Sequence, residues 1–323
     1  MMWLSLLLLI VGIVLILFGA DKLTDGATGL ARRFNVTELV IGLTVVAFGT
    51  SLPEFVTSFM STLKGSSDIS IGNIVGSNIF NALMIVGCAA WLSPITISKS
   101  TIAKDIPFAL LASLVLGVVS VDSLLDNGAP DILSRTDGLV LLGYFSVFMA
   151  YTYFISRNKE AGADMQQSDK PQQLMPYWKI FLYIIIGLAG LVIGGNLFVD
   201  GASQIAIAMG VSETIVGLTL VAAGTSLPEL ATSMVAARKG SSAIAIGNVI
   251  GSNIFNIFFV MGICATVEPM AVGNISYLDL GLMLASMLLL WGFSYTKRTI
   301  ERWEGAFLVI IYIAYLGYLI YNV

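Results

Sequence analysis

One stretch of this chain occurs twice, at residues 42–54 and at residues 217–229, and this duplication limits the fold more than any other feature. Both copies open on Gly-Leu-Thr and close on Gly-Thr-Ser-Leu-Pro-Glu. Each copy therefore places a carboxylate, hydroxyl groups and a proline in an otherwise apolar run. An ionisable group in such a run is energetically costly and is commonly functional. Glu54 and Glu229 are the first candidates for a shared site.

The duplication continues beyond this stretch. Equivalent residues differ by 175 positions from Asp25 to Asn81, without a gap. A second motif at 71–81 returns at 246–256, and within it an asparagine, a serine and an asparagine are spaced four residues apart. On a helix this spacing places the three side chains on one face. The residues in question are Asn73, Ser77, Asn81, Asn248, Ser252 and Asn256.

The glycines and first asparagines of the second motif have a supporting role in our interpretation. Small residues let membrane helices approach closely, so we expect Gly72, Gly76, Gly247 and Gly251 to be packing positions. Asn73 and Asn248 are expected to hydrogen-bond the ligand-binding groups and not to bind the ligand themselves. Four acids at expected span ends are interpreted as structural: Asp25, Glu38, Asp200 and Glu213. Thr37-Glu38 and Ser212-Glu213 are each interpreted as a helix cap followed by a first-turn acid.

Composition places the chain in a membrane. Hydrophobic residues make up 57% of the sequence and charged residues 11%, and the mean hydropathy is +0.91. These values are typical of an all-α polytopic membrane protein. The net charge of −4 and the lack of a basic tract argue against a nucleic-acid partner.

The residue inventory also limits the chemistry. The chain has no histidine, which excludes imidazole-based zinc or copper sites and a Ser-His nucleophile. Cys88 and Cys264 lie in apolar runs and are interpreted as packing residues. No cofactor is expected, and any bound metal ion must be held by oxygen atoms.

The sequence predicts ten transmembrane helices. A span needs about 20 apolar residues, and the first run begins close to the N-terminus without the positive charge of a signal peptide. The expected spans are 3–21, 39–63, 70–94, 105–122, 137–156, 178–198, 214–237, 245–267, 280–296 and 304–321.

The longest polar stretch separates the fifth and sixth spans. We therefore divide the chain into an N-terminal five-helix repeat at 1–156, a linker at 157–177 and a C-terminal five-helix repeat at 178–323. A further similarity supports this division, because Arg135-Thr-Asp-Gly opens the fifth span as Arg302-Trp-Glu-Gly opens the tenth. The offset there is 167, so the halves differ in an intervening loop.

Loop charge predicts the orientation. Loops after odd-numbered spans hold 14 of the 16 basic residues, so by the positive-inside rule they are cytoplasmic, as is the linker, and both termini lie outside. Because each half has an odd number of spans, the second half enters the membrane from the opposite side. Inverted repeats of this kind place a transported substrate near the midplane. We expect a multi-pass protein of a prokaryotic plasma (inner) membrane.

The repeated prolines predict breaks in two helices. Pro53 and Pro228 cannot donate a backbone hydrogen bond, so the carbonyls of Gly49 and Gly224 lose their helical partners. Broken helices are tolerated in a membrane where the freed oxygens line a cavity or bind an ion. A plain kink is the simpler reading of one copy, but it does not explain a carboxylate at the same place in both.

Helical spacing then places hydroxyl groups near each carboxylate. Thr50 and Ser51 precede Glu54 by four and three residues, and Thr225 and Ser226 precede Glu229 in the same way. Two carboxylates, four hydroxyls and free carbonyls form an all-oxygen site for a hard cation. Calcium accepts six to eight oxygens in flexible geometry, whereas magnesium dehydrates reluctantly, so calcium and sodium are the expected ligands.

At these residues the chain resembles the sodium/calcium exchanger family of the cation/calcium antiporter superfamily, in its prokaryotic form. The resemblance covers both repeats and implies exchange of sodium for calcium by alternating access, with two short peripheral helices, the first and sixth, sliding across the remainder. It implies a central calcium site of Thr50, Glu54, Thr225 and Glu229. It further implies sodium sites at Ser51, Ser77, Ser226, Ser252 and the carbonyls of Ala47 and Ala222, with Asn81 and Asn256 in the middle.

Other functions remain open at this point. An intramembrane hydrolase using Ser51 or Ser226 would need a base, and neither motif has a histidine or lysine near it. A cation channel could use an all-oxygen site, although duplicated inverted halves favour alternating access. Proton/calcium and potassium-dependent exchange are the alternatives among antiporters, since some relatives carry Asp where this chain has Glu229 or Asn256. Exchange is expected to be electrogenic and independent of potassium, and the sequence leaves the oligomeric state open.

Overall fold

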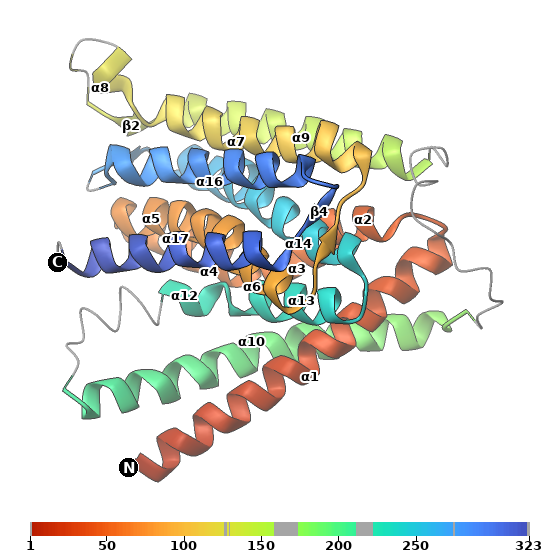
Figure 1. The fold of residues 1–323 in the computed structure, drawn as a ribbon. Coiled ribbons are helices and arrows are strands. Elements are labelled where there is room, and N and C mark those ends of the chain that lie inside the picture. Colours follow the sequence, from red (N-terminus) through yellow and green to blue (C-terminus); the bar gives the residue numbers. More distant parts are fainter. Residues whose placement is uncertain are drawn as a thin grey trace.

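The computed structural model describes residues 2–125, 128, 130–157, 174–210, 222–273 and 275–321, and these residues form a bundle of long helices (Figure 1). The elements of the first half are α1 (Met2–Phe34), α2 (Glu38–Ile41), the π-helix η1 (Gly42–Val46), α3 (Ala47–Thr50), α4 (Leu52–Leu63), α5 (Ser67–Ile79), η2 (Phe80–Ile85), α6 (Val86–Leu92), β1 (Ile95–Thr96), η3 (Thr101–Asp105), α7 (Ile106–Val119), α8 (Asp122–Leu125), β2 (Ile132–Leu133) and α9 (Arg135–Arg157).

The second half repeats much of this order. Its elements are α10 (Tyr177–Ala208), α12 (Ala222–Thr225), α13 (Leu227–Arg238), α14 (Ser242–Ile254), η6 (Phe255–Met261), α15 (Gly262–Val267), β3 (Met270–Ala271), α16 (Tyr277–Tyr295), β4 (Thr299–Ile300) and α17 (Arg302–Tyr321). Most of the expected linker, 158–173, lies outside the described residues.

The described residues contain eight helices long and apolar enough to cross a membrane, or nine when the bent helix at 38–63 is included. These correspond to nine of the ten expected spans. The expected span at 214–237 is represented by α12 and α13, and its first residues lie outside the described part. The all-α membrane fold is thus confirmed.

The first and sixth expected spans were wrong in length. α1 has 33 residues and α10 has 32, so neither is a short helix. Charged residues such as Asp21 and Lys22 ended the expected first span, but here they lie within α1. The helix continues through them without a break, and Lys22 Nζ lies 3.0 Å from Asp21 Oδ2.

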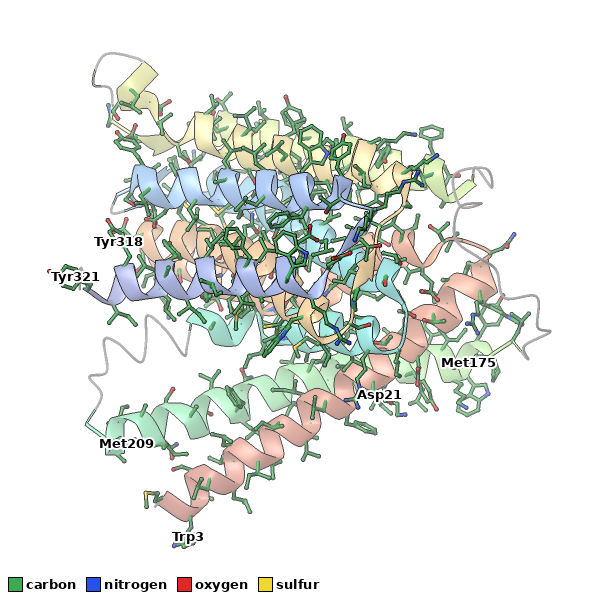
Figure 2. All side chains as sticks on the ribbon, in the orientation of Figure 1. Trp3, Asp21, Met175, Met209, Tyr318 and Tyr321 are labelled. Carbon is green, nitrogen blue, oxygen red and sulfur yellow. The ribbon has the colours of Figure 1, made fainter. Side chains whose placement is uncertain are left out.

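α1 and α10 cross the bundle together in opposite directions (Figures 1 and 2). Trp3 near the start of α1 and Met209 after the end of α10 lie at the same end of the molecule. Glycines allow the contact, because a Cβ added to Gly19 would lie 2.7 Å from the Gly187 carbonyl oxygen. The antiparallel arrangement of these two equivalent helices is what an inverted repeat requires.

Two short β-ribbons also join the two halves in antiparallel orientation. β1 pairs with β4 and β2 pairs with β3, both antiparallel. β1 and β3 occupy positions 175 residues apart, so each ribbon joins a strand of one half to a strand of the other. The ribbon of β4 and the ribbon of β2 lie at opposite ends of the bundle (Figure 1).

Both helices that carry the repeated proline are interrupted just before it. Ser51, with ψ of 6°, separates α3 from α4, and the axes on either side differ by 47°. Ser226 has the same backbone conformation between α12 and α13. The expected break is therefore present in both halves, and it brings Glu54 and Glu229 into the first turn of a new helix.

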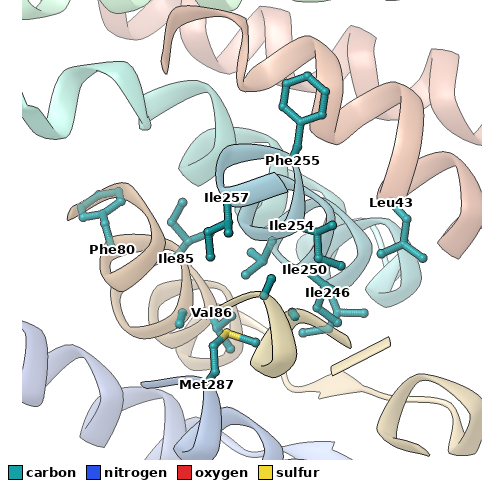
Figure 3. Close-up of a cluster of buried hydrophobic side chains, with 14 of the residues drawn as sticks. Leu43, Phe80, Ile85, Val86, Ile246, Ile250, Ile254, Phe255, Ile257 and Met287 are labelled. Atoms are coloured by element: carbon teal, nitrogen blue, oxygen red, sulfur yellow. The ribbon is translucent and has the colours of Figure 1, made fainter. Parts of the chain in front are cut away.

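The second motif forms the centre of the molecule. In the continuous helix from α14 to α15, 83% of the residues in the most apolar stretch are buried, whereas the corresponding share in α1 is 22%. Ile246, Ile250 and Ile254 lie along α14 in a cluster with Ile85 and Met287 (Figure 3). The central helix is therefore buried on all sides, and its polar side chains, such as Asn248 and Ser252, are buried with it.

Candidate cation site

The two glutamates of the repeat are both fully buried. Each accepts a hydrogen bond from the serine of the other half. Ser226 Oγ donates to Glu54 Oε1 over 2.7 Å, and Ser51 Oγ donates to Glu229 Oε1 over 2.9 Å. The N-terminal turns of α4 and α13 also provide a positive dipole end near each carboxylate. The repeats are therefore connected at the carboxylates.

This pairing corrects one expectation. Helical spacing predicted that Thr50 and Ser51 would converge on Glu54 of their own copy. The break at Ser51 removes the helical geometry on which that prediction depended. Ser51 instead reaches Glu229, and Thr50 Oγ1 donates to Asn248 Oδ1 over 3.1 Å.

Four buried carboxylate and amide oxygens of this region have no hydrogen-bond partner in the described part of the chain. They are Glu54 Oε2, Glu229 Oε2, Asn81 Oδ1 and Asn256 Oδ1. Neither glutamate forms an ion pair with a lysine or arginine among the described residues. Buried carboxylate oxygens without a donor are costly unless a cation or proton neutralises them. The arrangement is suited to a positively charged ligand.

The middle asparagines are held by a second pair that the sequence analysis did not single out. Asn81 Nδ2 donates to Asn253 Oδ1 over 2.9 Å, and Asn256 Nδ2 donates to Asn78 Oδ1 over 3.3 Å. These bonds use the amide nitrogens of Asn81 and Asn256 and leave their oxygens free. The signal for Asn78 and Asn253 was available, because both occur in the second motif 175 positions apart.

Asn73 and Asn248 make the contacts expected of supporting residues. Asn248 Nδ2 donates to the main-chain oxygen of Glu229 over 3.4 Å and to Ser233 Oγ over 3.0 Å. Asn73 makes the equivalent bonds to Glu54 and Ser58 in the first half. These asparagines hold each carboxylate helix against the neighbouring central helix.

The remaining candidates lie in the same region. Ser226 Oγ lies 3.1 Å from Ser77 Oγ, so these two hydroxyls from opposite halves are in contact. Ser252 is fully buried, and among the described residues its hydroxyl makes no hydrogen bond to Ser51. Thr225 Oγ1 lies 3.5 Å from Asn73 Oδ1.

The two expected carbonyl ligands are positioned on the broken helices. Ala47 begins α3 and its oxygen accepts weakly from Thr50 Oγ1, at 3.4 Å. Ala222 begins α12, and its side chain lies outside the described part. Both therefore precede the breaks, on the N-terminal side of the serines.

The glycines of the second motif pack as expected in one half. A Cβ on Gly251 would lie 2.6 Å from the Leu43 oxygen, and one on Gly247 would lie 2.9 Å from the Leu39 oxygen. These glycines let α14 lie against η1. Gly76, the counterpart of Gly251, would meet no atom of the described residues within 4 Å, and the residues equivalent to η1 in the second half lie outside the described part.

Other expectations concern residues outside the site. Thr37 Oγ1 caps α2 by accepting from Val40 N over 3.3 Å, as predicted, whereas Glu213 lies outside the described residues. Cys88 and Cys264 are free. The described residues contain no cluster of three or more His, Cys, Asp or Glu side chains able to hold a metal ion. Two carboxylates with neutral oxygens are thus the available ligand set.

The fold and the site define a membrane transporter for cations, built from two similar halves around two buried carboxylates. The sequence model of the sodium/calcium exchanger protein family matches residues 4–154 and 179–321. The chain therefore belongs to this family of antiporters.

Relatives match over most of their length. The chain is 34% identical to the sodium/calcium exchanger MaX1 of Methanosarcina acetivorans, covering 99% of this chain and all of the relative. It is 38% identical to the inner membrane protein YrbG of Escherichia coli, covering 85% and 84%. A solved structure of the sodium-calcium exchanger NCX_Mj, soaked with sodium and strontium, matches with a TM-score of 0.83 and 34% identity over 98% of this chain and 99% of that one.

Proposed function

We propose that this protein exchanges sodium for calcium across the membrane by alternating access. The observation that carries the proposal is the pair Glu54 and Glu229, each fully buried, each bonded through one oxygen to the opposite half and each with a second oxygen free. Calcium between them would be neutralised by two charges and bound by both repeats at once. The printed names of MaX1 and NCX_Mj, both exchangers of sodium and calcium, support this assignment.

Calcium needs six to eight oxygens, and the two carboxylates supply four of them when bound in a bidentate manner. We assign further ligands to Thr50 and Thr225, whose hydroxyls precede the glutamates across each break. Calcium binding at this position would use oxygens of both halves and would depend on their relative placement.

Sodium would use the hydroxyl groups that flank the centre. One flanking site consists of Ser77, Ser226 and Glu54. Ser226 Oγ lies 2.7 Å from Glu54 Oε1 and 3.1 Å from Ser77 Oγ. The other consists of Ser51, Ser252 and Glu229. The carbonyls of Ala47 and Ala222 complete these sites, and the free amide oxygens of Asn81 and Asn256 lie in the middle.

Efflux of preloaded sodium from vesicles distinguishes exchange from a channel. A coupled exchanger releases sodium only when calcium is supplied on the opposite side. A cation channel would release sodium down its gradient without calcium, and that result would contradict the proposal.

The topology that we propose places both termini outside and the linker at 157–177 in the cytoplasm, between repeats at 1–156 and 178–323. It rests on the distribution of lysine and arginine between the loops. The membrane assignment is a prokaryotic inner membrane, as in the printed name of YrbG.

Exchange is expected to be electrogenic, with three sodium ions per calcium ion. The two glutamates carry two negative charges, so one calcium ion or two sodium ions would neutralise the site. Exchange of two sodium ions for one calcium ion would move no net charge. A third sodium is accommodated because the flanking and middle oxygens form more than two clusters. Calcium uptake into proteoliposomes, measured at several clamped membrane potentials, should change with voltage. A rate indifferent to voltage would support two sodium ions.

Exchange is also expected to be independent of potassium. A third carboxylate between the glutamates would let the site hold an additional monovalent cation, but position 256 is a neutral asparagine that matches Asn81. Sodium-driven calcium uptake should therefore proceed at equal rates with potassium and with an inert cation on both sides. Uptake that requires added potassium would overturn this assignment.

A further inference from the structure

A lysine beyond the end of α13 is bound to two acids of α1. Lys239 Nζ lies 2.6 Å from Asp21 Oδ1 and 2.6 Å from Asp25 Oδ1, and it also donates to the main-chain oxygen of Asp21 over 3.1 Å. These contacts join the long helix α1 to the loop between α13 and α14. The carboxylates of the cation site take no part in them.

The same loop and an equivalent acid occur in the other half. Lys-Gly-Ser-Ser follows α4 at 64–67 and begins again at Lys239, 175 positions later. Both glycines have positive φ, 73° for Gly65 and 80° for Gly240, so the two loops share a backbone conformation. By the same offset Asp200 on α10 corresponds to Asp25 on α1.

The equivalent lysine and acid, Lys64 and Asp200, do not pair in the described structure. Lys64 and Asp200 are both exposed, and no ion pair forms between them. Equivalent residues thus form an ion pair in one half and are apart in the other. In a transporter made of inverted repeats, one repeat or bundle moves against the other when access changes sides, so a contact formed in one half can give way to its equivalent in the other.

We propose that the two Lys-Gly-Ser-Ser loops carry alternating ion latches on the long helices. Lys239 holds α1 through Asp25 and Asp21 in the state described here, and Lys64 holds α10 through Asp200 in the opposite state. The latches lie at opposite ends of the bundle, since the repeats are inverted. This inference rests on the alternating access of the proposed function but not on the identity of the transported ions.

The strength of these pairs suits a reversible latch. The Lys239 side chain is 30% exposed and its acid partners about 40%, and ion pairs that remain in contact with water contribute little stability. A latch of this kind shifts the population of two states without trapping either. The halves are not identical, because Asn196 stands where the first half has Asp21. The first latch therefore has one acid more, which favours the state described here.

Crosslinking with a short bifunctional maleimide tests the proposal on the full chain in proteoliposomes, with Cys88→Ala and Cys264→Ala as background. One protein carries Asp25→Cys with Lys239→Cys, and the other carries Asp200→Cys with Lys64→Cys. Both are treated with the crosslinker in sodium alone, in calcium alone and without either ion. We expect both pairs to link, and the condition that raises the yield of one pair should lower that of the other several-fold.

Failure to link positions 64 and 200 in every condition would overturn the proposal, as would yields that rise and fall together. The crosslinking yield can be measured whether or not the protein transports. An absence of sodium-driven calcium uptake would therefore defeat the proposed function, and the crosslinking yields would still decide whether the latch exists. An Asp200→Cys and Lys239→Cys pair, taken from opposite ends, serves as the control that should not link.

Charge reversal gives a second measurement. Asp200→Lys and Lys64→Asp should each slow transport several-fold, and the double variant should restore it, because the reversed pair can form again. The mismatched combination of Asp200→Lys with Lys239→Asp should not restore transport. A double variant no faster than either folded single variant would contradict a contact between positions 64 and 200.

Discussion

Replacing either Glu54 or Glu229 by glutamine is expected to abolish calcium transport. The substitution keeps the volume of the side chain and an oxygen that can accept from Ser226 or Ser51, so the protein should still fold. It leaves calcium with one compensating charge in a buried site. Removing one partner of a buried charge pair costs about 3 to 5 kcal/mol, which corresponds to a loss of roughly 100-fold or more in affinity.

Calcium uptake by purified variants in proteoliposomes measures this effect, and size-exclusion profiles verify folding. Glu301→Gln is the matched control, because Glu301 lies outside the site and forms an ion pair with Lys297, over 2.7 Å. This control should transport at the rate of the wild type. Near-normal uptake by either site variant would show that the calcium site lies elsewhere.

Gly251→Ala is expected to cause the second large loss. The added Cβ would lie 2.6 Å from the Leu43 oxygen and 2.7 Å from the Ala47 Cβ, which forces α14 away from η1 and α3. Overpacking of this kind costs about 1 to 3 kcal/mol. The shift would also separate Thr50 from Asn248, whose hydrogen bond of 3.1 Å spans the same contact. Both thermal stability and calcium transport should fall.

Thermal unfolding in detergent and calcium uptake in proteoliposomes measure the two effects. Gly292→Ala is the control, since its added Cβ would meet no atom of the described residues within 4 Å. The control should keep the stability and transport of the wild type. A Gly251→Ala protein as stable and active as this control would mean that close packing at η1 is unimportant.

The sequence was sufficient for the class of fold and for the position of both helix breaks. Duplicated motifs with a proline after Thr-Ser predicted an interruption near Ser51 and Ser226, and the breaks occur at these two residues. Proline acts through its own backbone, so its effect can be predicted locally. The same is true of the Thr37 cap.

Effects that depend on contacts between the halves could not be predicted in this way. Helical spacing assigned Ser51 to Glu54, whereas the structure joins it to Glu229 across the repeat. Hydropathy ended the first span at Asp21, whereas α1 continues to Phe34, and the contact of Asp21 with Lys239, 218 positions later, could not be read from either stretch alone. Asn78 and Asn253 were passed over because spacing on one helix does not show that they meet across the centre.

The most direct test of the central claim is calcium uptake by sodium-loaded proteoliposomes diluted into sodium-free medium that contains calcium. Exchange at Glu54 and Glu229 predicts uptake that requires the outward sodium gradient, falls to background when a sodium ionophore collapses that gradient, and is absent from the Glu54→Gln protein. Uptake by the wild type that continues undiminished without a sodium gradient would contradict the account.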